Sequence, residues 1–327
     1  MINFDMDLVY DKVSKKSRED FDDVYGIMRV IKRGKNMAFG DRKDAKRVKG
    51  MSGLAQICID LKPNRSVSDV YINQKMDMTE LVKYIDKKKT AGENVTYFYA
   101  FLAAIGKAVW NRPKMNYFVA NRHLYEHNEI VLSFVAKVSF DDHAEEMMVM
   151  LPIDKDDTIY TIGEKVKAKL DSFRNKKTGK VQKEGANSAI DVIGKLPNFI
   201  RVPFVGLFKW CDKKGILPAG FVKDNLYYST MIVSNLGSIK CGAIFHNITD
   251  FGSSSSLITM GEIRDEEVII DGKKVVKKLC EWGMNFDERI ADGYYFAKSC
   301  HMLQYIFDHP EMLEEPASTK IEMPELR

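Results

Sequence analysis

The stretch NFDERIADGYYFAK, from Asn285 to Lys298, closes an extended segment and opens an amphipathic helix. The charged turn DERIADG (287–293) separates the two, and by itself it is typical of a surface turn. The helix continues to about residue 308 because apolar residues recur on one of its faces: Phe296, Ala297, Cys300, Leu303, Ile306 and Phe307. The stretch therefore predicts a strand, a turn and a buried helix in succession.

The residues before this stretch predict strands and helices in alternation. The run EEVIIDGKKVVKKLCEWGMNF (266–286) predicts a hairpin, because Asp271-Gly272 is a strong two-residue turn signal. Extended segments are predicted at 54–61, 69–78, 129–140, 144–154, 227–237 and 256–263, and helices at 79–90, 93–112 and 158–173. This alternation indicates an α/β or α+β fold with a mixed sheet.

Composition indicates an ordinary globular protein. The 327 residues are 45% hydrophobic and 29% charged, enough for one large domain or two small ones. The N-terminus is acidic and has no apolar signal region, which predicts a cytoplasmic protein. The five cysteines form no C-x-x-C pair and the six histidines no metal-ligand spacing, so we expect neither a disulfide framework nor a bound metal.

Two segments carry basic or apolar surfaces that leave alternatives open. Basic residues crowd positions 29–49, which predicts an anion-binding arm or a solvated extension; aromatic residues are not interleaved for base stacking, so we expect no nucleic-acid partner. Residues 189–217 mix aromatic, aliphatic and basic side chains. Such a segment is typical of a peripheral membrane contact or of a helix that packs on a neighbouring subunit, although Pro197 and Pro203 interrupt its apolar face.

Three motifs in the last third carry a family resemblance: SNLG (234–237), DERIADG (287–293) and DHPEML (308–313). In this order and approximate spacing they resemble the catalytic domain of the dihydrolipoamide acyltransferases of 2-oxo acid dehydrogenase complexes, structural cousins of chloramphenicol acetyltransferase. The resemblance covers roughly residues 54–313 and is specific only at its C-terminal end. It implies a domain at 54–327 behind a basic arm at 1–53. From the residues before 54 we expect no lipoyl-bearing module ahead of the domain.

The resemblance also implies a fold and a site. The fold is a two-layer α/β sandwich with a mixed sheet covered by helices, assembled as a homotrimer or something larger with active-site channels between subunits. In the family a histidine takes the proton of the acceptor and a serine stabilises the oxyanion. Ser234 matches that serine, with Asn235 beside it, and Asp292 matches a mainly structural acid for which Arg65 is a candidate partner. Gly293 is expected to permit a tight start of the last helix.

Glu288 stands where the family has its catalytic histidine. A glutamate has a reference pKa of about 4.3 and a thiol one of about 8.5, so an ordinary carboxylate is too weak a base by about 5 to 6 kcal/mol. Burial and neighbouring acids raise such a pKa, whereas an inward-pointing Arg289 lowers it. Glu288 is therefore either a base in a strongly perturbed site or a group that no longer takes a proton.

Other groups offer weaker candidates for the missing base. His246 follows Ser234 by twelve residues on a segment that approaches the channel in the family, but a loop histidine held by hydrogen bonds is the commoner case. The serine run 253–256 predicts a flexible connector.

Two functions follow from these residues. One is a CoA-dependent acyltransferase that carries an acyl group from acyl-CoA or another thioester to a thiol, hydroxyl or amine and binds no cofactor covalently. The other is a non-catalytic trimeric scaffold or ligand-binding relative, a pseudoenzyme.

Overall fold

A mixed six-stranded sheet organises the computed structural model, which describes residues 42, 44–137, 146–174, 194–217, 222 and 225–324. Its strands lie in the order β2 (Asp69–Asp77), β9 (Lys273–Asp287), β8 (Ser256–Ile270), β7 (Met231–Asn235), β5 (Val131–Lys137) and β6 (Glu146–Pro152). β7 is parallel to both β5 and β8, and the other pairs are antiparallel. A smaller antiparallel sheet has the order β1 (Ala45–Arg47), β4 (His123–His127) and β3 (Tyr117–Ala120).

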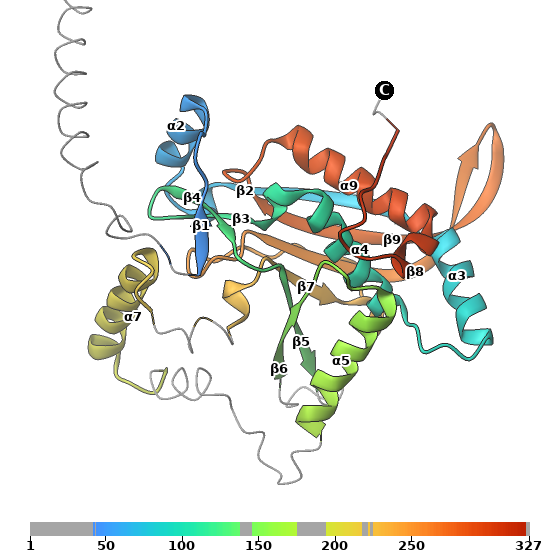
Figure 1. Ribbon diagram of the computed structural model, residues 1–327, viewed down its shortest axis with the longest axis horizontal. Helices are drawn as coiled ribbons and strands as arrows, with labels where there is room; N and C mark the ends of the chain where they lie inside the picture. Colours follow the sequence, from blue (N-terminus) through green and yellow to red (C-terminus); the bar gives the residue numbers. More distant parts are fainter. Residues whose placement is uncertain are drawn as a thin grey trace, which may run out of the picture. The chain divides into compact units, whose positions relative to one another are not determined.

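Helices cover one face of the large sheet (Figure 1). They are α3 (Thr79–Thr90), α4 (Tyr97–Asn111), α5 (Ile159–Arg174) and α9 (Gly293–Asp308). Two further helices, α2 (Gly53–Leu61) and α7 (Asn198–Lys213), lie to the side of this layer (Figure 1). Short 3₁₀ turns occur at η1 (Arg65–Val67), η2 (Pro113–Asn116), η3 (Leu226–Tyr228), η4 (Gly237–Ile239) and η5 (Pro310–Glu314).

The core lies between this sheet and its helices. Successive side chains of a strand point to opposite faces, so Trp282, Met284 and Phe286 of β9 all point toward the helices. The Trp282 ring centroid lies 5.5 Å from that of Phe101 in α4, and the Phe286 ring stacks on Phe296 of α9 at 4.8 Å. The two-layer α/β arrangement predicted from the sequence, with helices over a mixed sheet, is therefore confirmed.

The opposite face of the sheet, which we call the second face, carries small and polar side chains. On β9 these are Gly283, Asn285 and Asp287. The segment 241–250 crosses this face: the Thr259 hydroxyl donates to the Ile244 carbonyl oxygen, and a Cβ at Gly283 would come within 2.6 Å of that oxygen. Gly283 is thus required for the close approach of the segment to the sheet.

Several local predictions can be compared with the structure. The hairpin of β8 and β9 is confirmed, and its turn residues Asp271 and Gly272 have φ of 50° and 76°, as a type I′ turn requires. The apolar face of α9 is confirmed except that Ala297 is exposed. The extended segment predicted at 54–61 is wrong. These residues form α2, because the Ser52 hydroxyl caps the helix by accepting from the Ala55 amide.

Part of the predicted N-terminal arm can be described. β1 pairs with β4, and the buried Arg42 guanidinium donates to the Asp212 backbone carbonyl at 2.8 Å, so these residues pack with the domain. The rest of the predicted arm, which is residues 1–41 and 43, lies outside the described residues. The stretch 175–193 also lies outside them.

Candidate functional site

Ser234 lies near the end of β7 on the second face of the sheet. Its neighbours Met231 and Val233 are buried among the helices, so alternation turns the half-buried Ser234 the other way. Ser234 pairs in register with Thr259 of β8, and Thr259 pairs with Gly283 of β9. Asn235 follows and is also half-buried; its carbonyl oxygen accepts a hydrogen bond from the Ser238 hydroxyl.

Glu288 is the first residue beyond β9. Its amide donates to the Ser68 carbonyl at 2.9 Å, which fixes the backbone. Its carboxylate forms an ion pair with the Lys62 ammonium at the end of α2, and both side chains are partly exposed. Sequence reasoning missed Lys62, because no local pattern indicates that the end of α2 meets the turn after β9.

A single chain does not bring Ser234 and Glu288 together. Ser234 lies at the level of Gly283 on β9, five residues before Glu288. At about 3.3 Å per residue along the strand and about 4.8 Å between neighbouring strands, the two residues are roughly 15 to 20 Å apart. A site that uses both therefore needs two copies of the chain.

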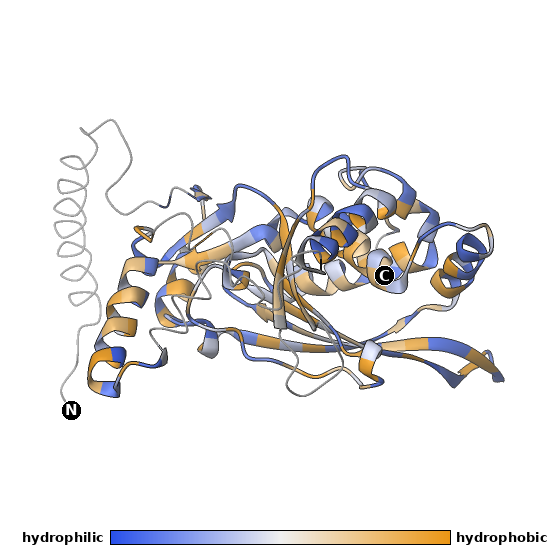
Figure 2. Cartoon of the chain, turned by 90° about the horizontal axis from the view of Figure 1, so that it is seen from below, coloured by the Kyte–Doolittle hydropathy of each residue, from blue (hydrophilic) through white to orange (hydrophobic). Residues whose placement is uncertain are grey.

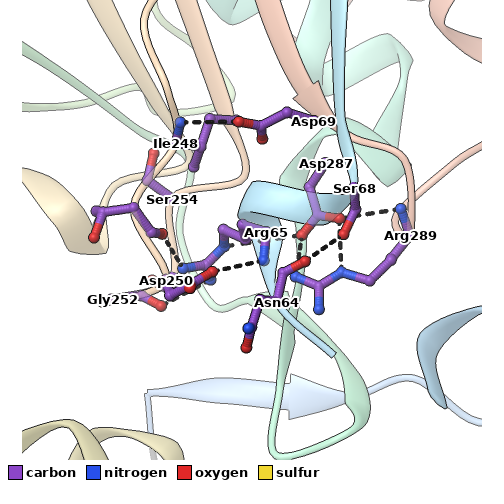
Figure 3. Close-up of polar contacts among 12 residues, drawn as sticks. Asn64, Arg65, Ser68, Asp69, Ile248, Asp250, Gly252, Ser254, Asp287 and Arg289 are labelled. Carbon is purple, nitrogen blue, oxygen red and sulfur yellow. Dashed lines mark hydrogen bonds and ion pairs between the residues drawn. The ribbon is translucent and has the colours of Figure 1, made fainter. Parts of the chain in front are cut away.

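A buried ionic cluster holds the turn that carries Glu288 (Figure 3). Arg289 donates to both oxygens of the fully buried Asp287, at 2.8 and 2.7 Å, and to the Lys62 carbonyl at 3.0 Å. Arg65 Nε lies 3.8 Å from the same carboxylate, and its terminal nitrogens donate to the carbonyls of Thr249, Phe251 and Gly252. Since a buried carboxylate here balances two buried guanidinium groups, the cluster ties η1, the 249–252 loop and the end of β9 into one unit.

The predicted pairing of Asp292 with Arg65 is wrong. Asp292 is the N-cap of α9, and its carboxylate accepts from the Tyr295 amide at 2.8 Å. Arg65 faces Asp287 instead, because η1 packs beside the end of β9. Gly293 also differs from expectation, since a Cβ there would meet no atom within 4 Å and its φ is not positive. Asp292 therefore stabilises the helix start, and Gly293 is not required by the geometry.

His246 lies on the segment that crosses the second face. Its backbone amide donates to the Asn285 side-chain oxygen at 3.4 Å, and its imidazole is exposed. Ile244, two residues earlier, bonds to Thr259, which is the register partner of Ser234. His246 is thus held by its backbone above the same face as Ser234.

A hydrogen-bonded serine–histidine pair, with a buried serine, occurs elsewhere. His127 Nδ1 lies 2.9 Å from the Asn116 carbonyl, so Nδ1 carries the proton and Nε2 accepts from the Ser253 hydroxyl, also at 2.9 Å. The prediction of a flexible serine connector is therefore wrong: Ser253 to Ser256 are all buried, and Ser256 begins β8. Because Ser253 is buried, this pair stabilises the packing of β4 on the 249–256 segment.

The His127 pair predicts a pH-dependent stability. Burial lowers the pKa of His127 to about 4, with Asp44 opposing that shift and Arg42 and Arg65 adding to it. The unfolded chain then binds a proton more readily between about pH 6.5 and 4, so this contribution is complete above pH 6.5 and is lost as the pH falls. When the pH is lowered from about 7.5 to 4.5, the free energy of unfolding of wild type should fall by about 2 to 3 kcal/mol more than that of His127→Gln. Urea unfolding at both pH values measures this difference. The exposed His301→Gln should behave as wild type. Equal losses in wild type and His127→Gln contradict this expectation.

Neither Ser234 nor Glu288 lines the cavity beside His127. A cavity of about 450 Å³ is lined by Arg42, Asp44, His127, Tyr228 and their neighbours, and by none of the predicted site residues. Within the described ranges, no group of three or more His, Cys, Asp or Glu side chains is arranged to hold a metal ion.

Known proteins resemble this chain in part of its sequence and in its fold. Residues 222–314 match the family model of the 2-oxoacid dehydrogenases acyltransferase (catalytic domain), which spans both Ser234 and Glu288. The structure is similar to the cubic core of the pyruvate dehydrogenase multienzyme complex (TM-score 0.50, 15% identity, 87% of this chain and 96% of that one). The dihydrolipoamide acetyltransferase of Azotobacter vinelandii gives the same values, and a chloramphenicol acetyltransferase gives a TM-score of 0.48 at 10% identity over 80% and 99% of the chains. No curated protein matches the sequence.

The family resemblance predicted from the three motifs is therefore confirmed over residues 222–314, and the chain has the fold of the cubic pyruvate dehydrogenase core.

Proposed function

We propose that the protein is a thioester-dependent acyltransferase whose active site forms between two copies of the chain, with Ser234 from one copy and Glu288 from the other. The observation that carries the proposal is the separation of these two residues across the sheet of a single chain. Both belong to the segment that matches the acyltransferase family model. A homotrimer supplies such sites around a threefold axis, and assemblies larger than a trimer are compatible with it.

Exposed apolar side chains beside both residues support a site between copies. Next to Glu288, α2 presents Leu54, Ile57 and Leu61 to solvent. The side chain of Leu54 is 74% exposed and that of Leu61 is 75% exposed. Near Ser234, Val135 of β5 and the pair Ile244 and Phe245 are exposed. Apolar groups gathered in this way are typical of surfaces that another protein covers.

The proposed reaction needs the two residues, a thioester donor, with acyl-CoA as the expected one, and a thiol, hydroxyl or amine acceptor. The Glu288 carboxylate accepts the proton of the acceptor as the acceptor atom bonds to the thioester carbonyl carbon. The Ser234 hydroxyl donates to the carbonyl oxygen as it becomes an oxyanion. The carbon–sulfur bond then breaks, and the CoA thiolate takes the proton from Glu288.

The ion pair between Lys62 and Glu288 favours the second candidate, a non-catalytic trimeric scaffold. A carboxylate held by an ammonium group is occupied as a structural partner, and a general base must have a free oxygen facing the acceptor. In this candidate Glu288 joins α2 to the turn after β9 and takes no proton.

Turnover separates the two candidates. The purified protein, given acetyl-CoA and a set of thiol, hydroxyl and amine acceptors, should form an acetylated product that mass spectrometry detects. Glu288→His should increase its kcat by about ten-fold or more, because an imidazole is the better base at neutral pH. A wild-type protein that forms no product, with product appearing only in Glu288→His, would establish the scaffold instead.

A further inference from the structure

α7 exposes an apolar surface that the domain does not cover. Phe199 is 77% exposed, Leu207 58% and Trp210 52%. Figure 2 colours most of this helix as hydrophobic. α7 lies outside the segment that matches the acyltransferase family model, so the proposed catalytic site does not account for its surface.

The helix is attached to the domain along one side and near its C-terminal end. Asp212 is the only buried residue of α7; its carboxylate accepts from the Tyr228 hydroxyl at 2.8 Å and from the Gly252 amide at 2.9 Å, and it pairs with Arg42 at 3.2 Å. One turn earlier, the Phe208 ring stacks on Phe251 at 5.4 Å. These contacts fix which face of α7 points away from the domain.

The outward face is apolar along its whole length. At 100° per residue, Phe199, Pro203, Leu207 and Trp210 fall in a stripe roughly 100° wide, on the side opposite Asp212. No charged residue of α7 lies within this stripe. The exposed lysines Lys209 and Lys213 border it.

The charges around the stripe have one sign. Residues 194–217 contain the basic residues Lys195, Arg201, Lys209, Lys213 and Lys214, and their one acidic residue, Asp212, is buried against Arg42. A symmetric contact between two copies of α7 would bring these like charges together. An anionic lipid surface would be complementary to both the charges and the stripe.

We propose that α7 binds to the surface of an anionic bilayer, with its axis parallel to the membrane plane and Phe199, Leu207 and Trp210 among the acyl chains. The basic side chains then lie at the level of the headgroups. Binding is peripheral: none of the helices in the described part of the chain is long and apolar enough to cross a bilayer.

Vesicle flotation with the full chain tests the proposal. The protein should float with vesicles of phosphatidylcholine and phosphatidylglycerol, and much less with phosphatidylcholine alone. Leu207→Ser/Trp210→Ser should reduce binding at least about ten-fold, because both side chains leave the acyl-chain region. Lys209→Glu/Lys213→Glu should reduce binding to the anionic vesicles by a similar factor.

Matched controls come from the tip of the β8–β9 hairpin. Ile269→Ser/Val276→Ser removes side chains that are 74% and 61% exposed, and Lys273→Glu/Lys274→Glu reverses two exposed charges. Both control variants should float as wild type does. The first control removes exposed apolar side chains and the second reverses two positive charges, as the α7 variants do, but neither changes a residue of α7.

Three results would overturn the proposal. The first is a wild-type chain that stays with the soluble fraction in both lipid mixtures. The second is equal flotation of wild type and the two α7 variants, which would assign binding to another segment, such as the basic residues 29–49. The third is a fall in the oligomer mass of Leu207→Ser/Trp210→Ser in light scattering, which would show that a second copy covers the stripe.

Discussion

Asp287→Ala should lower the free energy of unfolding by about 3 to 5 kcal/mol. The substitution removes the one carboxylate that faces two guanidinium groups, Arg289 at 2.7 Å and Arg65 at 3.8 Å, and all three residues are buried. The buried Arg289 guanidinium would then lose its ion-pair partner, and the buried Arg65 would lose one of the carboxylates that balance its charge. Chemical denaturation followed by circular dichroism measures the loss.

The adjacent Glu288→Ala is the matched control. It also removes a carboxylate from an ion pair, but the pair with Lys62 is partly exposed. Exposed pairs contribute at most about 1 kcal/mol, so this variant should remain close to wild type in stability. Equal losses in the two variants would mean that the buried cluster does not hold the turn together.

Ser234→Ala should lower kcat by about 10²- to 10³-fold and change the Km for the thioester little. The hydroxyl is expected to bind the oxyanion, which exists only after attack on the carbonyl carbon. The control is Ser238→Ala, four residues further along the chain, whose hydroxyl is exposed and donates to the Asn235 carbonyl oxygen. A wild-type kcat in Ser234→Ala, or an equal loss in Ser238→Ala, contradicts the role of Ser234.

Much of the fold could be predicted because its signals are local. The Asp271-Gly272 turn, the periodicity of α9 and the alternation in β9 each occur within a few residues, and each was sufficient to identify its element. The three C-terminal motifs predicted the family resemblance for the same reason. The prediction for α2 failed because Leu54, Ile57 and Leu61 remain exposed, so that Ile59 alone does not mark a buried face. Only the Ser52 cap indicates the helix.

The candidate site was harder to predict because it depends on contacts between distant segments. Arg65 and Lys62 lie more than 200 residues from Asp287 and Glu288, and which arginine meets which acid is decided by how η1 and α2 pack on the end of β9. Sequence spacing also gave no sign that Ser234 and Glu288 are kept apart by the register of three strands.

Complementation between two inactive variants tests the central claim most directly. Glu288→Gln retains Ser234, and Ser234→Ala retains Glu288, so each variant alone should be nearly inactive. If the site forms between copies, co-expressed oligomers that contain both variants have some sites with an intact Ser234 from one copy and an intact Glu288 from the next. Their turnover per chain should then be many times that of either variant, up to a sizeable fraction of wild type. Mixed oligomers that are no more active than the separate variants would contradict a shared site.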